Sequence, residues 1–234
     1  MSEFRPGGFQ ILPYIIKNLI IINVLIFLAQ QTFGAGGNTR LEDLFALHTW
    51  QSSLFKPWQF VTYMFMHGSW GHIFWNMFAV WMFGAVLENL WGPKRFLTFY
   101  VVCGLGAALA HMIVLYFENQ GLIKEFNSLS PMDKEVYYTL FVRHLNSATL
   151  GASGAVFGCL AAFGYLFPNR YISIYFLFPI KAKWFVIIYA GIELFSGIKN
   201  SAGDNVAHFA HLGGGLVGII LVYYWNKTNR HNFY

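Results

Sequence analysis

The chain has 234 residues, of which 56% are hydrophobic, 20% aromatic and only 11% charged. A soluble domain carries a charge on about a quarter of its residues, so this composition argues against a soluble enzyme or binding module and favours an integral membrane protein. The formal net charge is +5, but the basic residues cluster at the ends of apolar segments, which indicates membrane topology rather than a nucleic-acid-binding patch.

Six apolar segments follow one another along the chain, each long enough, or nearly so, to approach the roughly 20 residues that cross a bilayer core. The first is too long for a signal-peptide core and lacks a convincing cleavage site, so we expect it to remain as a helix. The fold class is therefore an all-α polytopic membrane protein. Helices are predicted within residues 12–30, 58–87, 95–117, 152–167, 181–198 and 206–226.

Basic residues in the tails and in two short connections predict the topology. Because six is an even number, both ends lie on one side of the membrane, and the positive-inside rule assigns that side to the cytoplasm. We expect a membrane domain at residues 12–226 between cytoplasmic tails at residues 1–11 and 227–234. The basic residues concerned are Arg5, Lys17, Lys94, Arg95, Arg170, Lys181, Lys183, Lys227 and Arg230.

Two long connections, residues 31–57 and 118–150, belong to the opposite side. Connections of this length are usually functional or disordered. The stretch "LEDLFAL" in the first suits a short amphipathic helix at the membrane interface. In the second, Ser130 followed by Pro131 is a typical helix start and predicts a helix over "SPMDKEVYYTLFVRHL".

Polar side chains within apolar segments are candidates for function, because a membrane helix normally hides or pairs its polar groups. Ser153 stands at the start of the fourth segment. In the second segment His72 and Asn76 are four residues apart, so on a helix they share a face and direct two hydrogen-bond donors to one place. His67 precedes them, and Glu88 ends that segment.

The sixth segment carries His208 and His211, three residues apart and therefore on one helix face. Glycines continue that face, and small residues at this spacing let a neighbouring helix approach closely in lipid. The fourth segment has a matching smooth face, so segments four and six are predicted to touch with Ser153 and a histidine at the contact. The glycines concerned are Gly154 and Gly158 on the fourth segment and Gly214, Gly215 and Gly218 on the sixth.

A serine in contact with a histidine is the minimal pair for nucleophilic catalysis. The imidazole takes the hydroxyl proton as the oxygen attacks a carbonyl, and the resulting oxyanion needs preorganised donors. His72, Asn76 and the backbone amide of Ser153 would supply those donors. From the helix faces, no acidic third member of the pair is evident.

Other interpretations fit parts of this pattern. A lone serine in a membrane helix is more often a packing residue, and glycine faces usually mean only helix packing. The four histidines would offer metal ligands, but Asp204 is the only carboxylate or thiolate beside them and no zinc-protease spacing such as HExxH is present. No metal and no cofactor are expected.

Taken together, these residues resemble the rhomboid family of intramembrane serine proteases, over about residues 58–224. "GASG" resembles the GxSG motif of that family, which opens the fourth transmembrane helix, and implies that Ser153 is the nucleophile. "AHLGGGLVG" resembles its sixth-helix motif and implies that His211 is the base. His208 is the rival, but Gly214 follows His211 by one helical turn, as the motif requires.

The second segment extends the resemblance. His72 and Asn76 match the HxxxN motif of the family, which implies an oxyanion-stabilising role, and His67 matches a recurrent family histidine. "GAVLE", ending at Glu88, resembles a GxxxE motif. The chain departs from the family where Trp58 is followed by Gln59 instead of arginine, and its connection between segments three and four is long.

The resemblance implies a six-helix bundle and a serine endopeptidase that cleaves transmembrane protein substrates through a Ser–His dyad within the bilayer. We expect a multi-pass protein of a bacterial inner (plasma) membrane, with Gly151, His67 and His208 lining the site and the fifth helix as a lateral gate. Residues 31–57 are expected to lie partly in the membrane. Ala152, where inactive relatives tend to have proline, favours an active enzyme.

Two interpretations from other classes compete with the protease. The first is a non-catalytic rhomboid-like protein that binds and escorts membrane proteins, against which the intact serine and histidine argue. The second is a small channel or transporter, which would usually pair charges within the membrane; only Glu88 and Glu193 are near candidates. The sequence leaves the oligomeric state and the physiological substrate open.

Overall fold

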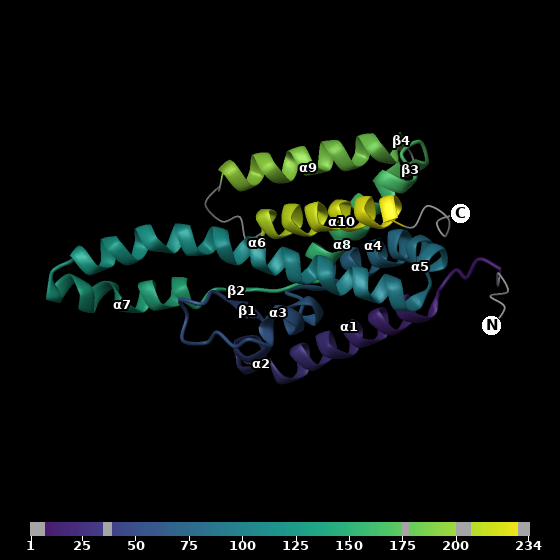
Figure 1. Ribbon diagram of the computed structural model, residues 1–234. Coiled ribbons are helices and arrows are strands. Elements are labelled where there is room, and N and C mark those ends of the chain that lie inside the picture. Colours follow the sequence, from purple (N-terminus) through teal and green to yellow (C-terminus); the bar gives the residue numbers. More distant parts are fainter. Residues whose placement is uncertain (1–7, 35–38, 175–177, 200–206, 229–234) are drawn as a thin grey trace.

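The computed structural model describes residues 8–34, 39–174, 178–199 and 207–228, and it is all-α apart from two short strand pairings. The long helices lie side by side along a common direction (Figure 1). Each of the six predicted apolar segments contains a helix. These helices are α1 (Tyr14–Phe33), α4 (Trp70–Ala79) with its continuations η2 (Val80–Gly84) and α5 (Ala85–Trp91), α6 (Pro93–Ser128), α8 (Ser153–Leu166), α9 (Ala182–Lys199) and α10 (His208–Thr228).

Four of these helical stretches are long and apolar enough to cross a membrane, within the part of the chain that the structure describes: α1, α4 to α5, α6 and α10. The apolar helix α8 has only 14 residues. It is nevertheless the most buried of the set and packs against both α6 and α10. The start of α1 and the end of α10 lie at the same end of the bundle (Figure 1).

The second predicted segment was placed too early, because its long helix starts at Trp70 and not near residue 58. The preceding residues form α3 (Gln59–Thr62), η1 (Tyr63–Phe65) and a turn. Ser69 sets the new start: its backbone is extended, and its Oγ accepts a hydrogen bond from the backbone N–H of His72 at 3.1 Å. This is the geometry of a serine N-cap.

The two long connections contain the predicted short helices, α2 (Arg40–Phe45) and α7 (Pro131–Leu145), and Ser130 is confirmed as the N-cap of the latter. Helices α6 and α7 extend together beyond the ends of the other helices (Figure 1). Strand β1 (Leu47–His48) pairs antiparallel with β2 (Ala148–Thr149) and so joins the two connections just before α8. Strands β3 (Tyr171–Ile174) and β4 (Phe178–Lys181) form a hairpin between α8 and α9.

Gln59 ties the first connection together from a fully buried position. Its Oε1 accepts hydrogen bonds from the backbone N–H groups of His48 at 3.2 Å and Lys56 at 3.1 Å. Its Nε2 donates to the carbonyl oxygens of Asp43 at 3.1 Å and Leu54 at 3.0 Å. A guanidinium has donors only, so glutamine satisfies two N–H groups here that an arginine at this position could not.

Glu88 holds the start of α1 against the second helix. Its two carboxylate oxygens accept hydrogen bonds from the backbone N–H groups of Ile15 at 2.8 Å and Ile16 at 2.9 Å. These N–H groups belong to the first turn of α1 and have no partner within that helix, and the helix dipole favours a negative charge there. The match to the GxxxE motif therefore corresponds to a helix cap supplied by a neighbouring helix.

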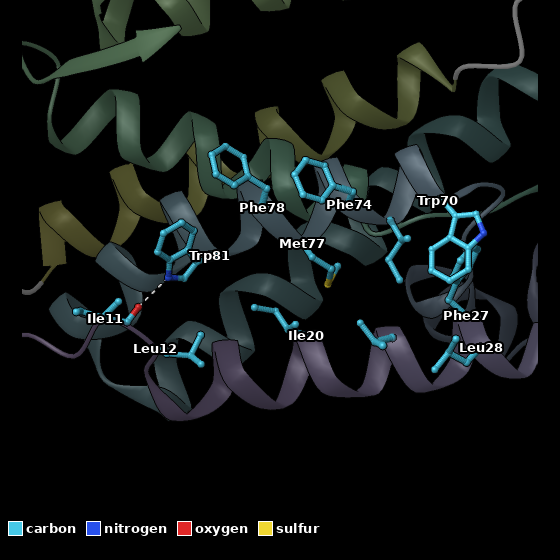
Figure 2. Close-up of a pocket in the computed structure, with 12 residues that line it drawn as sticks. Ile11, Leu12, Ile20, Phe27, Leu28, Trp70, Phe74, Met77, Phe78 and Trp81 are labelled. Carbon is cyan, nitrogen blue, oxygen red and sulfur yellow. Dashed lines mark hydrogen bonds between the residues drawn. The ribbon is translucent and has the colours of Figure 1, made fainter. Parts of the chain in front are cut away.

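A groove runs along the outside of the bundle between α1 and α4 to η2. Side chains of both helices line it, and Ile20, Met77 and Trp81 are among those that point into it (Figure 2). The Trp81 Nε1–H donates to the Ile11 carbonyl oxygen at 2.9 Å near one end. Every lining side chain is hydrophobic, so the groove suits hydrocarbon and holds none of the predicted catalytic residues.

Candidate active site

Ser153 and His211 meet where α8 and α10 cross. The Ser153 hydroxyl lies 2.8 Å from His211 Nε2, within hydrogen-bond distance, and the imidazole is buried. Ser153 is the first residue of α8, so its hydroxyl stands at a helix N-terminus where the first N–H groups lack intrahelical partners. The predicted contact between the fourth and sixth segments, with this pair at its centre, is present.

Glycines allow this close approach. A side chain at Gly214 would collide with the carbonyl oxygen of Gly154, and one at Gly218 would meet the carbonyl oxygen of Gly158 at 2.8 Å. The two backbones therefore touch at two successive turns. Bulkier residues on either face would separate α8 from α10, and with them the serine from the histidine.

Phe157 fixes the plane of the His211 ring. The two rings stack with centroids 4.3 Å apart and an angle of 5° between their planes. Phe157 lies one helical turn after Ser153 on α8, so the helix that carries the hydroxyl also carries the surface on which the imidazole rests. This stacking limits rotation of the His211 imidazole about the bond that joins it to Cβ.

Gly151 shapes the approach to Ser153. Its φ angle is +131°, in the region that side chains rarely adopt, and its backbone N–H donates to the Tyr63 carbonyl oxygen at 2.9 Å. A Cβ on Gly151 would lie 2.7 Å from Nε2 of His72. Glycine at this position thus lets the His72 ring lie directly against the backbone that precedes the serine.

His72 presents a donor beside that backbone. The N–H of Gly68 lies 3.4 Å from Nδ1 of His72 and donates to it, so in the neutral ring the proton resides on Nε2, which faces Gly151. Asn76 is buried one turn further along α4, and its Nδ2 donates to the His72 carbonyl oxygen at 3.1 Å. Both predicted oxyanion residues therefore lie on one face of α4, with the His72 ring the closer to Gly151.

His67 packs behind His72. The two rings lie 5.1 Å apart between centroids, and the ring of His67 is buried. Gln30 on α1 grips the backbone of His67: its Oε1 accepts from the His67 N–H at 2.9 Å and its Nε2 donates to the carbonyl oxygen at 3.3 Å. The predicted site-lining histidine is therefore positioned by the first helix.

Glu193 on α9 belongs to this site, although the sequence analysis considered it only as a charge within the membrane and not as a partner of the histidines. Its Oε2 lies 2.9 Å from Nδ1 of His211 and 2.6 Å from Nδ1 of His208. The expectation that the pair has no acidic partner is wrong in this respect. The available signal was an ionisable residue inside an apolar segment, which usually faces the interior of the bundle. The spacing along α9 did not indicate that this residue meets His211 on α10.

Among the residues that the structure describes, the same three side chains also have the spacing of a metal-ion site, since one ligand atom each from Glu193, His208 and His211 lies within 4.8 Å of the others. Hydrogen bonds already account for these short distances. Asp204, the other carboxylate considered near the histidines, lies outside the described residues.

Known proteins resemble this chain over most of its length. A family model described as the rhomboid domain matches residues 54–227. The chain is 29% identical over 217 residues to Rhomboid-like protein 11, chloroplastic, of Arabidopsis thaliana, a match that covers 89% of the chain but only 64% of that relative. It is 28% identical over 218 residues to the Rhomboid protease AarA of Providencia stuartii, covering 87% of the chain and 69% of the relative. It is 25% identical over 214 residues to the Rhomboid protease GlpG of Haemophilus influenzae, covering 92% of each.

Proposed function

Since this chain belongs to the rhomboid family, we propose that it is an intramembrane serine endopeptidase that hydrolyses peptide bonds in or near the transmembrane segments of other membrane proteins. The observation that carries this proposal is the 2.8 Å contact between the Ser153 hydroxyl and His211 Nε2. Two of the relatives named above are called rhomboid proteases, which supports the same activity.

Acylation begins when Ser153 Oγ attacks the carbonyl carbon of the scissile peptide bond while His211 Nε2 takes the hydroxyl proton. The carbonyl π pair moves to oxygen and forms a tetrahedral oxyanion. When the oxyanion collapses, the C–N bond breaks, and His211 passes its proton to the leaving amine nitrogen. The remaining acyl group is held on Ser153 as an ester.

Deacylation repeats these steps with water as the nucleophile. His211 Nε2 takes a proton from a water molecule as its oxygen attacks the ester carbonyl, and a second tetrahedral oxyanion forms. Its collapse breaks the bond to Ser153 Oγ, which recovers the proton from His211. The products are a carboxylic acid and the free enzyme.

The oxyanion forms beside groups that can donate hydrogen bonds to it. The candidates are the Nε2–H of His72, the amide of Asn76 and the backbone N–H of Ser153 at the start of α8. Preorganised donors of this kind are typically the largest contribution to catalysis of acyl transfer. The His72 ring is supported for this role by its contact with Gly151.

We propose six membrane spans, formed by the four long apolar helices together with α8 and α9, and cytoplasmic tails at both ends. The common end of the bundle at which α1 begins and α10 ends supports the even number (Figure 1). The Ser153 end of α8 then faces the opposite side, from which water reaches the site. The relatives named above include a chloroplast protein and proteins of two bacteria, so the family by itself does not select one membrane.

Labelling with a fluorophosphonate probe tests the proposal on the purified full chain in detergent. The wild type is expected to label at Ser153 and to cleave a model transmembrane substrate, and Ser153→Ala is expected to do neither. A well-folded wild type that neither labels nor cleaves would show that the chain is not a serine protease and would favour a binding protein of the same fold.

A further inference from the structure

We propose that Glu193 is a positioning residue of this active site, which orients the ring of His211 and stabilises the imidazolium that forms when Ser153 gives up its proton. This inference rests on the proposed function. It would make the catalytic arrangement a Ser–His–Glu line instead of an isolated pair. The line crosses three helices, α8, α10 and α9.

The two ring nitrogens of His211 have separate partners. Nε2 lies 2.8 Å from Ser153 Oγ, and Nδ1 lies 2.9 Å from Glu193 Oε2. A carboxylate only accepts hydrogen bonds, so Nδ1 must be the nitrogen that carries the proton. Nε2 of the neutral ring is then the free base, which is the tautomer that the attack by Ser153 requires.

Charge supports the same assignment. Glu193 is only 4% exposed, and a buried carboxylate is costly unless it is paired and hydrogen-bonded. Its Oε2 accepts from two imidazole N–H groups, those of His208 and His211. When His211 takes the serine proton, the new positive charge forms next to this carboxylate in surroundings of low dielectric constant, where the attraction is strong.

His208 is the second histidine that contacts Glu193. It lies one turn before His211 on α10, and its Nδ1 is 2.6 Å from the same oxygen of Glu193. Two donors from one helix therefore hold this carboxylate oxygen in position beside α10. His208, which we expected to line the site, reaches the base His211 through Glu193.

The competing explanation is that Glu193 merely fastens α9 to α10. Both explanations predict some loss of stability when the residue is changed, so stability alone does not separate them. They differ in what happens to turnover when the charge is removed but the hydrogen bonds can remain. Glu193→Gln makes that change, because its amide oxygen still accepts from both histidines.

The experiment compares wild type, Glu193→Gln, Glu193→Asp and His208→Gln in detergent, with kcat and KM for a model transmembrane substrate, the rate of fluorophosphonate labelling and Tm. We expect Glu193→Gln to keep KM within about 2-fold and to lower kcat at least about 10-fold. An Asp→Asn change in a soluble Ser–His–Asp triad, which also favours the wrong tautomer of the histidine, lowers kcat about 10⁴-fold. Glu193→Asp, which keeps the charge, should recover part of that loss. His208→Gln disturbs the link between α9 and α10 but leaves the carboxylate of Glu193 and its bond to His211 in place, so it should lower kcat less than Glu193→Gln at a similar Tm.

A folded Glu193→Gln with the kcat and labelling rate of the wild type would overturn the inference while leaving the protease intact. Equal losses of kcat in Glu193→Gln and His208→Gln, each in proportion to a fall in Tm, would assign Glu193 to fastening alone. Wild type that neither labels nor cleaves would instead refute the proposed function. NMR of the wild type labelled with ¹⁵N-histidine provides a test that does not depend on any Glu193 variant folding: a downfield Nδ1–H proton of His211 is expected, and its absence would overturn the inference.

Discussion

Gly214 of α10 lies against the backbone carbonyl of Gly154 of α8 so closely that no Cβ fits between them. Ser153 precedes one of these glycines, and His211 lies one turn before the other. The distance between the catalytic candidates is therefore set by backbone contact between two helices and not by the reach of long side chains.

Replacing Gly214 with alanine should separate α8 from α10 and weaken the contact between Ser153 and His211. Overpacking a tight contact typically costs about 1–3 kcal/mol, and we expect a lower Tm together with at least a 10-fold loss of kcat/KM. Gly215→Ala is the matched control, because the nearest atoms to its added Cβ lie at 3.8 Å and 3.9 Å. If both variants behave alike, close approach at Gly214 does not control the site.

Alanine at His211 should abolish cleavage, whereas alanine at His208 should leave measurable activity. Nε2 of His211 is the imidazole nitrogen within hydrogen-bond distance of Ser153 Oγ, while His208 reaches the site through Glu193. Cleavage of a model substrate and labelling of Ser153 measure the difference. Equal and complete loss in the two variants would contradict the assignment of His211 as the base.

Gln59→Ala should destabilise the protein, because it loosens the first long connection, residues 31–57. The change removes a buried amide that is hydrogen-bonded to five backbone groups around it, and a buried group left unsatisfied costs about 1–3 kcal/mol. We expect a clear fall in Tm. Gln31→Ala, at an exposed position on α1, is the control and should leave Tm unchanged.

Gln59→Arg extends this prediction. Arginine is the residue that the family resemblance leads one to expect at this position, yet here it should also lower Tm, because the N–H groups of His48 and Lys56 would lose their acceptor. A variant as stable as the wild type would show that the surrounding loop rearranges to suit a donor.

Glu88→Gln should loosen the start of α1. The carboxylate accepts two N–H groups of the first turn and carries a charge that the helix dipole favours, and such a cap contributes about 1–2 kcal/mol. The expected result is a lower Tm, with faster hydrogen exchange at Ile15 and Ile16. Glu118→Gln, at an exposed position on α6, serves as control; an equal shift there would exclude a specific cap.

The local features were predictable because they depend on neighbours in the chain. Ser130 and Pro131 predict the start of α7. The spacing of the glycines on the fourth and sixth segments predicts that these two helices touch; they are Gly154, Gly158, Gly214 and Gly218. The start of the second helix was misplaced, because the apolar run through Trp58 hides the N-cap at Ser69.

By itself, the sequence determined the membrane class and the order of the apolar segments, since composition carries that information. Regular spacing along a helix indicated Ser153 and a histidine, and the resemblance to the rhomboid motifs selected His211. Only the tertiary structure decided that Glu193 faces His211, that Gln59 joins the backbone of the first connection and that Glu88 caps a distant helix. These are contacts between elements far apart in the chain. Glu193 is a single ionisable residue on an otherwise apolar stretch of α9, so the sequence could indicate that it faces the interior but not which side chain it meets; packing against α8 and α10 decided that.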